Sequence, residues 1–458
     1  MKNRILLLMM ASGLIATAQL DKSSCPANLS IFAEFAKVKN YDSAYQPWLE
    51  VRNNCPELNV ATFKYGERIL NHKIKNATDD KAALQASLMS LYDDWLTYFP
   101  NTKRGASEVG KILSSKAQAM VDNKLGTKRE AYEIFDQAFT QDPNSFTSPK
   151  RLYTYFKTAY QLYKQGDKTA EVLFDKYEEV SEKFALEQTN LAKKLDVILK
   201  KLETGEALTS RDQRNKRVYE TNKFAFSTYA GNLDAMISKE SSCENLIPLY
   251  RKNFEVNRSN SVWLNRAASR MDAKECADDP LFVELVEALH AINPSANSAY
   301  YLGILKDKAG ESKAALAYYE ESLTLEQDQY RKADILYKIA VKFKKRNLKS
   351  KSRSYARKAL KNRPSMGKAY MLIASLYAAS ANDCGNTQFE KRAVYWLAAK
   401  TARKAATVDS GVKKTALKLA ASYEGRAPSK TDIFTEGRAG ETISFSCWIN
   451  SSVTVPQL

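Results

Sequence analysis

The chain of 458 residues has few residues that interrupt helices. It contains only 16 glycines and 12 prolines, and Ala, Leu, Lys, Glu and Tyr dominate the long segments between them. Most of these residues have good helix propensity, whereas glycine and proline are the costliest residues in a helix interior. The composition therefore excludes a turn-rich fold and predicts an all-α architecture for nearly the whole chain.

Long apolar runs are missing beyond the first segment of the chain. Lys2 and Arg4 precede an apolar run over residues 5–15, which leads to Ala16-Thr17-Ala18, the small-x-small pattern of a signal-peptidase site. Polar residues follow before the run reaches the roughly 20 residues of a membrane-spanning helix. We expect export, removal of residues 1–18 and no transmembrane segment afterwards. A lipid-modified Cys25 is an alternative, which the polar residues before it disfavour.

The common catalytic and metal-binding motifs are also missing. The sequence has no G-x-S-x-G, no H-E-x-x-H and no phosphate-cradling glycine loop. It has two histidines, no C-x-x-C and cysteine spacings that suit no common zinc module. A cell-wall lyase built on a helical array is an alternative, but the tail after the last helical repeat is too short for a catalytic domain. We expect no enzyme activity, no catalytic residues, no cofactor and no metal.

Amphipathic helical stretches recur instead, several of them closed by a proline. The clearest unit spans residues 297–325, in which Leu302-Gly303, Gly310, Ala315 and Tyr319 occupy the small, turn and aromatic positions of a 34-residue helix-turn-helix repeat. The unit resembles the tetratricopeptide repeat (TPR) family. The resemblance implies that Gly303 allows two helices to approach closely and that repeat surfaces hold a protein partner. The general layout is similar to exported TPR proteins of Bacteroidota cell envelopes.

Four of the six cysteines flank two helical hairpins. Cys25 and Cys55 lie at the open end of one hairpin, and Cys243 and Cys276 lie at the open end of another. Two antiparallel helices of about 14 residues run out and back some 20 Å, which returns the second cysteine to the first. In an oxidising compartment we therefore expect two disulfides, each contributing about 3 to 4 kcal/mol on the chain-entropy model.

The first hairpin also fits the repeat pattern. With Cys25 at the first position of a repeat, three residues fall on core positions, Ile31, Phe32 and Phe35. Ala44 then falls on the small position, Trp48 on the aromatic position and Pro56 on the terminator.

The tail predicts a short β-hairpin over residues 441–456. Apolar residues alternate on one face as Ile443, Phe445, Cys447 and Ile449, and after a turn at residues 450–452 as Val453 and Val455. A lone hairpin is marginal in water, so this face must dock on the helices. We expect a third disulfide, Cys384–Cys447, to pin the hairpin as a cap.

Charge is concentrated in the rear part of the chain. Residues 331–430 contain 25 Lys and Arg against five acidic residues, an excess larger than the net +18 of the whole chain. Such a block projects a field that attracts anions, although it could be no more than a solvated surface. The residues expected at the rim that faces an anionic partner are Lys342, Lys344, Lys345, Arg346, Lys349, Lys351 and Arg353.

These patterns predict a TPR-like helical-hairpin solenoid with a short C-terminal β-hairpin. The expected parts are a signal peptide (1–18), an N-terminal helical array (19–170), a long charged helical hairpin (171–240), a C-terminal array (241–430, basic from 331) and a β-hairpin cap (431–458). The long hairpin could be a protruding arm for a partner, or simply longer repeat helices with solvated outer faces.

Two binding functions remain open. The first is a non-enzymatic scaffold or assembly factor in the periplasm, or on the periplasmic face of the outer membrane of a Gram-negative bacterium, that binds a protein partner. The second is the binding of an anionic envelope glycolipid or glycan by the basic array. We expect no nucleic acid as partner of an exported chain.

Overall fold

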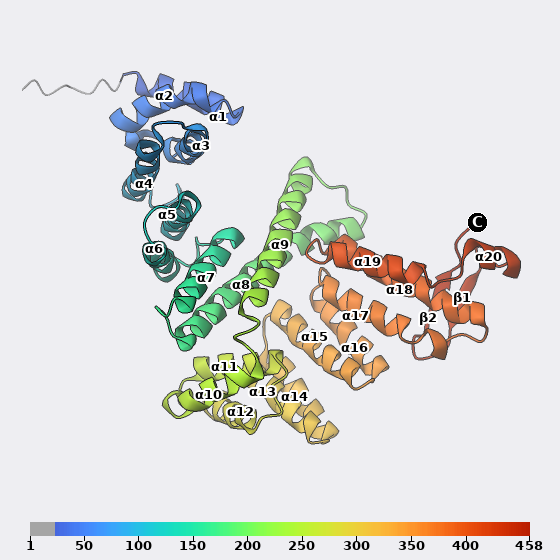
Figure 1. Ribbon diagram of the computed structural model, residues 1–458. Helices are drawn as coiled ribbons and strands as arrows, with labels where there is room; N and C mark the ends of the chain where they lie inside the picture. The colour runs from blue at the N-terminus through green and yellow to red at the C-terminus, as the bar shows by residue number, and fades with distance from the viewer. Residues whose placement is uncertain (1–22) are drawn as a thin grey trace, which may run out of the picture. The chain divides into compact units, whose positions relative to one another are not determined.

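The computed structural model describes residues 23–458, which divide between two compact units, Met1–Arg151 and Leu152–Leu458. These described residues form twenty α-helices and one two-stranded sheet (Figure 1). The signal peptide expected at residues 1–18 lies outside them.

The first unit consists of successive helix pairs. Its elements are α1 (Cys25–Lys37), α2 (Tyr41–Asn54), the short 3-10 helix η1 (Pro56–Leu58), α3 (Ala61–Asn76), α4 (Lys81–Tyr98), α5 (Val109–Asn123) and α6 (Lys128–Gln141). Each helix packs on its sequence neighbour, α1 on α2, α3 on α4 and α5 on α6. Pro56, Pro100 and Pro143 follow α2, α4 and α6, where a helix cannot easily continue.

The core of the first pairs is centred on Trp48. The indole Nε1 of Trp48 donates to the carbonyl of Thr62 (2.7 Å), and a Cβ on Gly66 would stand only 2.6 Å from the indole. Phe32 is buried as well, but Ile31 is 45% and Phe35 36% exposed. The expectation of a core position is therefore wrong for these two, because only one face of α1 contacts the helices that follow.

The second unit begins with most of α7 (Pro149–Lys164) and contains the longest helices. They are α8 (Ala170–Glu203) and α9 (Ser210–Ile237), followed by α10 (Cys243–Asn257), α11 (Ser261–Ala273), α12 (Pro280–Ile292), α13 (Ala296–Lys308), α14 (Ser312–Leu325), α15 (Gln329–Lys345), α16 (Lys349–Asn362), α17 (Gly367–Ala378), η2 (Ala381–Asp383), α18 (Gln388–Val408), α19 (Lys413–Glu424) and α20 (Lys430–Glu436). The chain ends with the strands β1 (Thr442–Phe445) and β2 (Ser451–Thr454).

The pair α13–α14 shows why small residues are needed at the repeat positions. A Cβ on Gly303 would lie 2.5 Å from the ring of Tyr319, so only glycine allows the two helices this contact. Ala315 and Tyr319 are both fully packed, each 1% exposed. The close approach predicted from the repeat pattern is thus confirmed.

The long pair α8–α9 is packed against other helices of its unit. Glu182 of α8 binds Arg266 of α11 (2.8 Å), and Lys193 of α8 binds Asp328, which caps α15 (2.7 Å). Such contacts along α8 favour long packed helices over a protruding arm, the two possibilities that the sequence leaves open.

The tail forms the expected β-hairpin on the helices. Strands β1 and β2 are antiparallel, with Ile443 opposite Val453, and both side chains are buried. Since Phe445 pairs with Ser451, the connecting loop covers residues 446–450. The predicted turn at 450–452 is therefore wrong, and Cys447 and Ile449 lie in the loop rather than on a strand.

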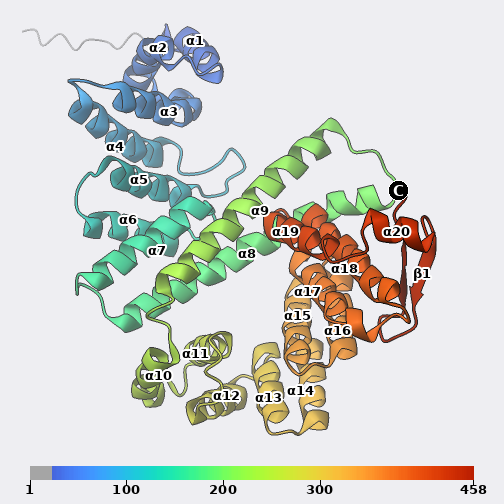
Figure 2. The same cartoon turned by 45° about the vertical axis from the view of Figure 1, so that its right-hand side comes forward.

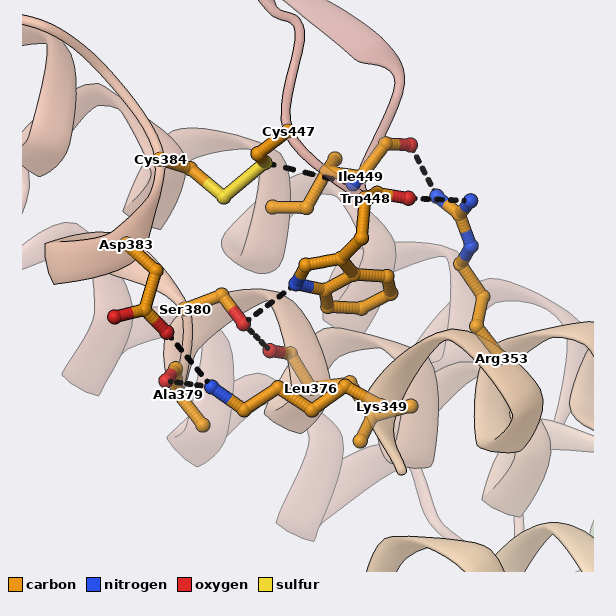
Figure 3. The surroundings of a disulfide bond; sticks show 10 residues. All are labelled: Lys349, Arg353, Leu376, Ala379, Ser380, Asp383, Cys384, Cys447, Trp448 and Ile449. Carbon is orange, nitrogen blue, oxygen red and sulfur yellow. Dashed lines mark hydrogen bonds and ion pairs between the residues drawn. A yellow bond between two sulfur atoms is a disulfide. The ribbon is translucent and has the colours of Figure 1, made fainter. Parts of the chain in front are cut away.

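The loop contacts α16 and the segment that follows α17 (Figure 3). Cys447 is bonded to Cys384, which directly follows η2. The indole of Trp448 donates to Ser380 Oγ (3.0 Å), and the guanidinium of Arg353 lies 5.0 Å from the ring centroid while it donates to the Trp448 carbonyl (2.9 Å). With the predicted turn at residues 450–452, Cys447 would lie on a strand, whereas here it belongs to the loop that makes these contacts.

The other cysteines are joined in the pairs that the sequence predicts. Cys25 is bonded to Cys55 and Cys243 to Cys276, each across one helix pair.

Candidate binding groove

A groove runs between the long helix α8 and the helices α13 to α17. One part has a volume of about 790 Å³ and the other about 460 Å³. Both parts are lined by Ala185 and Thr189 of α8 and by Asp334 and Lys338 of α15, so they are continuous. Clefts of this size commonly bind ligands. We call the feature the α8 groove.

Most charged groups in the α8 groove are paired within the chain. Asp334 lies 2.9 Å from Lys368 and 3.5 Å from Arg363. Burial raises the pKa of Asp334, but these two cations outweigh that effect and leave the pKa below its usual value. Lys193 and Asp328 form a further pair at the other part of the groove.

A buried ion pair lines one part of the groove. Lys223 of α9 lies 3.1 Å from Asp409 and donates to the carbonyl of Ser365 (3.2 Å). Burial lowers the pKa of Lys223, and the neighbouring Asp409 partly offsets this. Each charge is thus held by the other, and neither is free for a ligand.

Among the described residues, Lys338 and Arg331 are the cations of the groove lining without an ion pair, and of these two Lys338 lines both parts of the groove. Lys338 forms no ion pair with any residue in the described part of the chain, and its ammonium lies 5.3 Å from the centroid of the Tyr300 ring. The closest acids are engaged elsewhere, because Asp272 binds Lys342 (2.6 Å) and Asp334 binds Lys368.

Lys338 nevertheless keeps access to solvent from within the groove. The protein on both sides removes part of its hydration, and this burial lowers the pKa of the ammonium. Asp272 and Asp334 offset part of this effect on the pKa, and an arriving anion would add to their attraction for the ammonium. Lys338 is therefore the group in the groove best placed to bind one.

The rim residues expected to attract an anion lie together at the turn between α15 and α16, but most are already engaged. Four form ion pairs with acids of other elements: Lys342 with Asp272 (2.6 Å), Lys345 with Glu275, Arg346 with Asp307 and Lys349 with Asp383 (3.0 Å). Intramolecular pairing neutralises much of the field that these residues would project.

The remaining three rim residues contact uncharged groups. Lys344 donates to Ser375 Oγ (3.0 Å), Arg353 binds the loop of the cap, and the Lys351 ammonium lies 5.8 Å from the centroid of the Phe343 ring. Only Lys351 of the seven has no hydrogen bond or ion pair among the described residues.

The position of Lys338 could have been predicted from the sequence, although it was not among the expected rim residues. Asp334, Lys338 and Lys342 are spaced by four, so they share one face of α15. Lys223 had no such signal, because its partner Asp409 is remote in sequence and only folding brings the two together.

No group of three or more His, Cys, Asp or Glu side chains within residues 23–458 is placed to hold a metal ion. None of the helices in this same part of the chain combines the length and apolar character needed to span a bilayer.

Comparison with known proteins gives structural neighbours only. No family model and no curated protein sequence matches the chain. A TPR protein from Parabacteroides merdae is 12% identical, with 68% of this chain and 97% of that chain covered and a TM-score of 0.24. The human IFIT1 dimer with m7Gppp-AAAA is 14% identical, with 89% of this chain and 94% of that chain covered and a TM-score of 0.27. Yeast Tom70 is 11% identical, with 88% of this chain and 96% of that chain covered and a TM-score of 0.23.

These likenesses concern the fold alone. The helix pairs, the glycine–tyrosine contact of α13–α14 and the terminal hairpin define an all-α, TPR-like helical-repeat protein with a short C-terminal β-hairpin.

Proposed function

We propose that the protein is a non-enzymatic scaffold or assembly factor that holds an extended segment of a partner protein in the α8 groove. One observation carries this proposal: Lys338 lines both parts of the groove without an ion pair among the described residues, whereas four other lining cations, Lys193, Lys223, Arg363 and Lys368, are paired with acids. An acidic side chain of the partner would complete the ion pair that the chain itself leaves open.

The lining of the groove suits a peptide segment. Gln188, Asn190 and Asn297 supply amide groups that can donate to and accept from a peptide backbone. The described lining includes no histidine or cysteine, the side chains that most often act as catalytic base or nucleophile. Both features support a binding role.

We place this function in the cell envelope. Three disulfides suit an oxidising compartment, and the signal-peptide pattern of residues 1–18 points the same way. The periplasm, or the periplasmic face of the outer membrane of a Gram-negative bacterium, is the location that these features support.

The proposal is tested by cross-linking inside the cell. A photoreactive amino acid at Gln188 should trap a partner in the groove, and Lys338→Gln should reduce the adduct at least tenfold. Lys332→Gln removes the same charge from the same helix outside the groove lining and should leave the adduct unchanged. Equal adduct from the Lys338→Gln and Lys332→Gln proteins would contradict the role of the groove.

A second candidate function is the binding of an anionic glycolipid or glycan of the envelope by the basic array. It is favoured by the exposed cations of α16, which form no ion pairs among the described residues, in contrast to four of the rim residues. This candidate does not compete with the first, because it uses a different surface.

A further inference from the structure

Helix α16 presents a face made only of cations and serines. At 100° per residue, Ser350, Lys351, Ser354, Arg357, Lys358 and Lys361 fall within a sector of about 120°, and all six are exposed. The opposite side carries Ser352, Tyr355, Ala356 and Ala359, which are buried. We call the four cations Lys351, Arg357, Lys358 and Lys361 the α16 basic face.

The charges of the α16 basic face are free of acid partners. The helix contains no Asp or Glu, and none of the four cations forms an ion pair with another of the described residues. Two have their ammonium groups over aromatic rings, Lys351 5.8 Å from the centroid of Phe343 and Lys358 4.9 Å from that of Tyr355. Such cation–π contacts attract the ammonium groups without neutralising their charge.

The neighbouring charges limit the extent of the face. Glu320 of α14 is near enough to raise the pKa of Tyr355, although burial of that ring is the larger cause. On the other side, Arg353 is occupied by the carbonyls of the cap loop. The uncompensated charge is therefore confined to α16 itself and differs from the paired rim at the preceding turn.

We propose that the α16 basic face docks the protein on a membrane surface that carries anionic phosphate head groups. The inference sharpens the second candidate function and does not depend on the α8 groove. The four cations lie between Lys351 and Lys361, ten helical steps or about 15 Å apart along the axis, and all four are exposed. A surface with many laterally mobile phosphates can offer an anion to each of them.

The strength expected of this docking is modest and salt-dependent. A Lys or Arg at an anionic membrane surface contributes about a fivefold increase in binding, and the attraction decays within a Debye length. Four cations together are enough for measurable recruitment, although no apolar residue lies among them to insert into the bilayer.

Docking at α16 leaves the groove accessible. In both ribbon views α15 lies between α16 and α8 (Figures 1 and 2), and none of the four cations of the α16 basic face belongs to the groove lining. A scaffold held on a membrane by α16 could still accept a partner segment beside α8.

The test uses the full chain with its disulfides intact. Binding is measured by co-sedimentation with vesicles of phosphatidylcholine, and with vesicles in which one-third of the lipid is phosphatidylglycerol, at low and high salt. The wild type should prefer the anionic vesicles and lose this preference at high salt. The variant K351Q/R357Q/K358Q/K361Q should bind at least tenfold more weakly, with an unchanged thermal transition because these side chains are exposed.

The paired rim supplies the control. K342Q/K345Q/R346Q/K349Q removes the same number of charges from the four rim residues that are paired with acids, and it should reduce vesicle binding less than threefold. No preference of the wild type for anionic vesicles at low salt would overturn the inference. Equal losses in the two quadruple variants would also overturn it, since net charge alone would then explain the binding. The cross-linking test at Gln188 is unaffected by either result.

Discussion

Lys223 of α9 and Asp409 at the end of α18 form a buried ion pair with 3.1 Å between Nζ and Oδ1. Asp409 belongs to the loop between α18 and α19, and two hydrogen bonds also join this loop to α9. Ser227 Oγ donates to the Gly411 carbonyl (3.2 Å), and Ser410 Oγ donates to the Glu220 carbonyl (2.6 Å). Three contacts thus fix the long helix pair to the last repeat, and this fixed wall gives the α8 groove its shape.

The two partners of this pair should respond differently to substitution. Asp409 also accepts from the amides of Gly367 (3.1 Å) and Gly411 (3.0 Å), whereas Lys223 has only the Ser365 carbonyl besides it. Asp409→Asn leaves a buried ammonium uncompensated and should cost about 3 to 5 kcal/mol of unfolding free energy. Lys223→Met should cost clearly less. Urea denaturation compares them, and an equal or larger cost for Lys223→Met would refute the argument.

Gly303 provides a test of the repeat packing. Gly303→Ala places a methyl group against Tyr319 and should destabilise the protein by about 1 to 3 kcal/mol through overpacking. Gly231→Ala in α9 is the matched control, because nothing lies within 4 Å of the added Cβ. That substitution should stabilise by about 0.5 to 1 kcal/mol through helix propensity. Thermal unfolding distinguishes the two signs, and stabilisation by Gly303→Ala would contradict the close contact.

Local patterns predicted much of the fold. The helix pairs, the small residue at Gly303 and the β-hairpin all follow from periodicity and turn residues that lie close together in sequence. The disulfide pairs followed from the same source, because a hairpin of two equal helices returns Cys55 to Cys25 whatever the rest of the chain does.

Contacts between remote segments could not be predicted in this way. Ile31 and Phe35 satisfy the repeat pattern, yet their exposure depends on whether another helix covers that side of α1. The rim looked uniformly basic because its acid partners, such as Asp272 and Asp307, belong to other helix pairs. The groove forms because α8 packs beside α15, two helices that are remote in sequence. No local sequence pattern predicts it.

Asp142 should make the first unit sensitive to acid. Its side chain accepts from Ser107 Oγ (2.7 Å) and from the amides of Gly110 and Ser145 (both 3.2 Å). Burial raises the pKa of Asp142, but hydrogen bonds from Ser145 and Ser107 outweigh it and lower the pKa below the usual value. Its stabilising contribution is therefore complete above about pH 3.9 and is lost as the pH falls through the lower pKa of the folded state.

The substitution Asp142→Asn should reveal this dependence. The variant should be about 1 to 3 kcal/mol less stable than the wild type at neutral pH, because it loses a charged acceptor of several hydrogen bonds. The difference should narrow below pH 4, where the wild-type carboxyl also becomes protonated. Urea denaturation at a series of pH values measures it, and a constant difference across the series would exclude the carboxylate as its origin.

The terminal hairpin should depend on the disulfide Cys384–Cys447. A two-stranded hairpin is marginal by itself, and this bond closes a segment with a sequence separation of 63 residues, which corresponds to about 4 kcal/mol on the chain-entropy model. Replacing both cysteines by serine should therefore speed amide hydrogen exchange in β1 and β2 by at least tenfold, as followed by mass spectrometry. Exchange in α13 and α14 should stay unchanged, because their packing does not involve the cap.

The contacts of Trp448 decide how far the hairpin loosens. The indole keeps its hydrogen bond to Ser380 and its contact with Arg353 when the disulfide is absent, so the hairpin should remain docked but open more often. Adding Arg353→Ala to the serine variant should release it further, whereas serines at Cys25 and Cys55 in the first unit should not affect β1 and β2. If the strands exchange at the wild-type rate without the Cys384–Cys447 bond, the helices alone hold the cap and the disulfide has no role in fixing it.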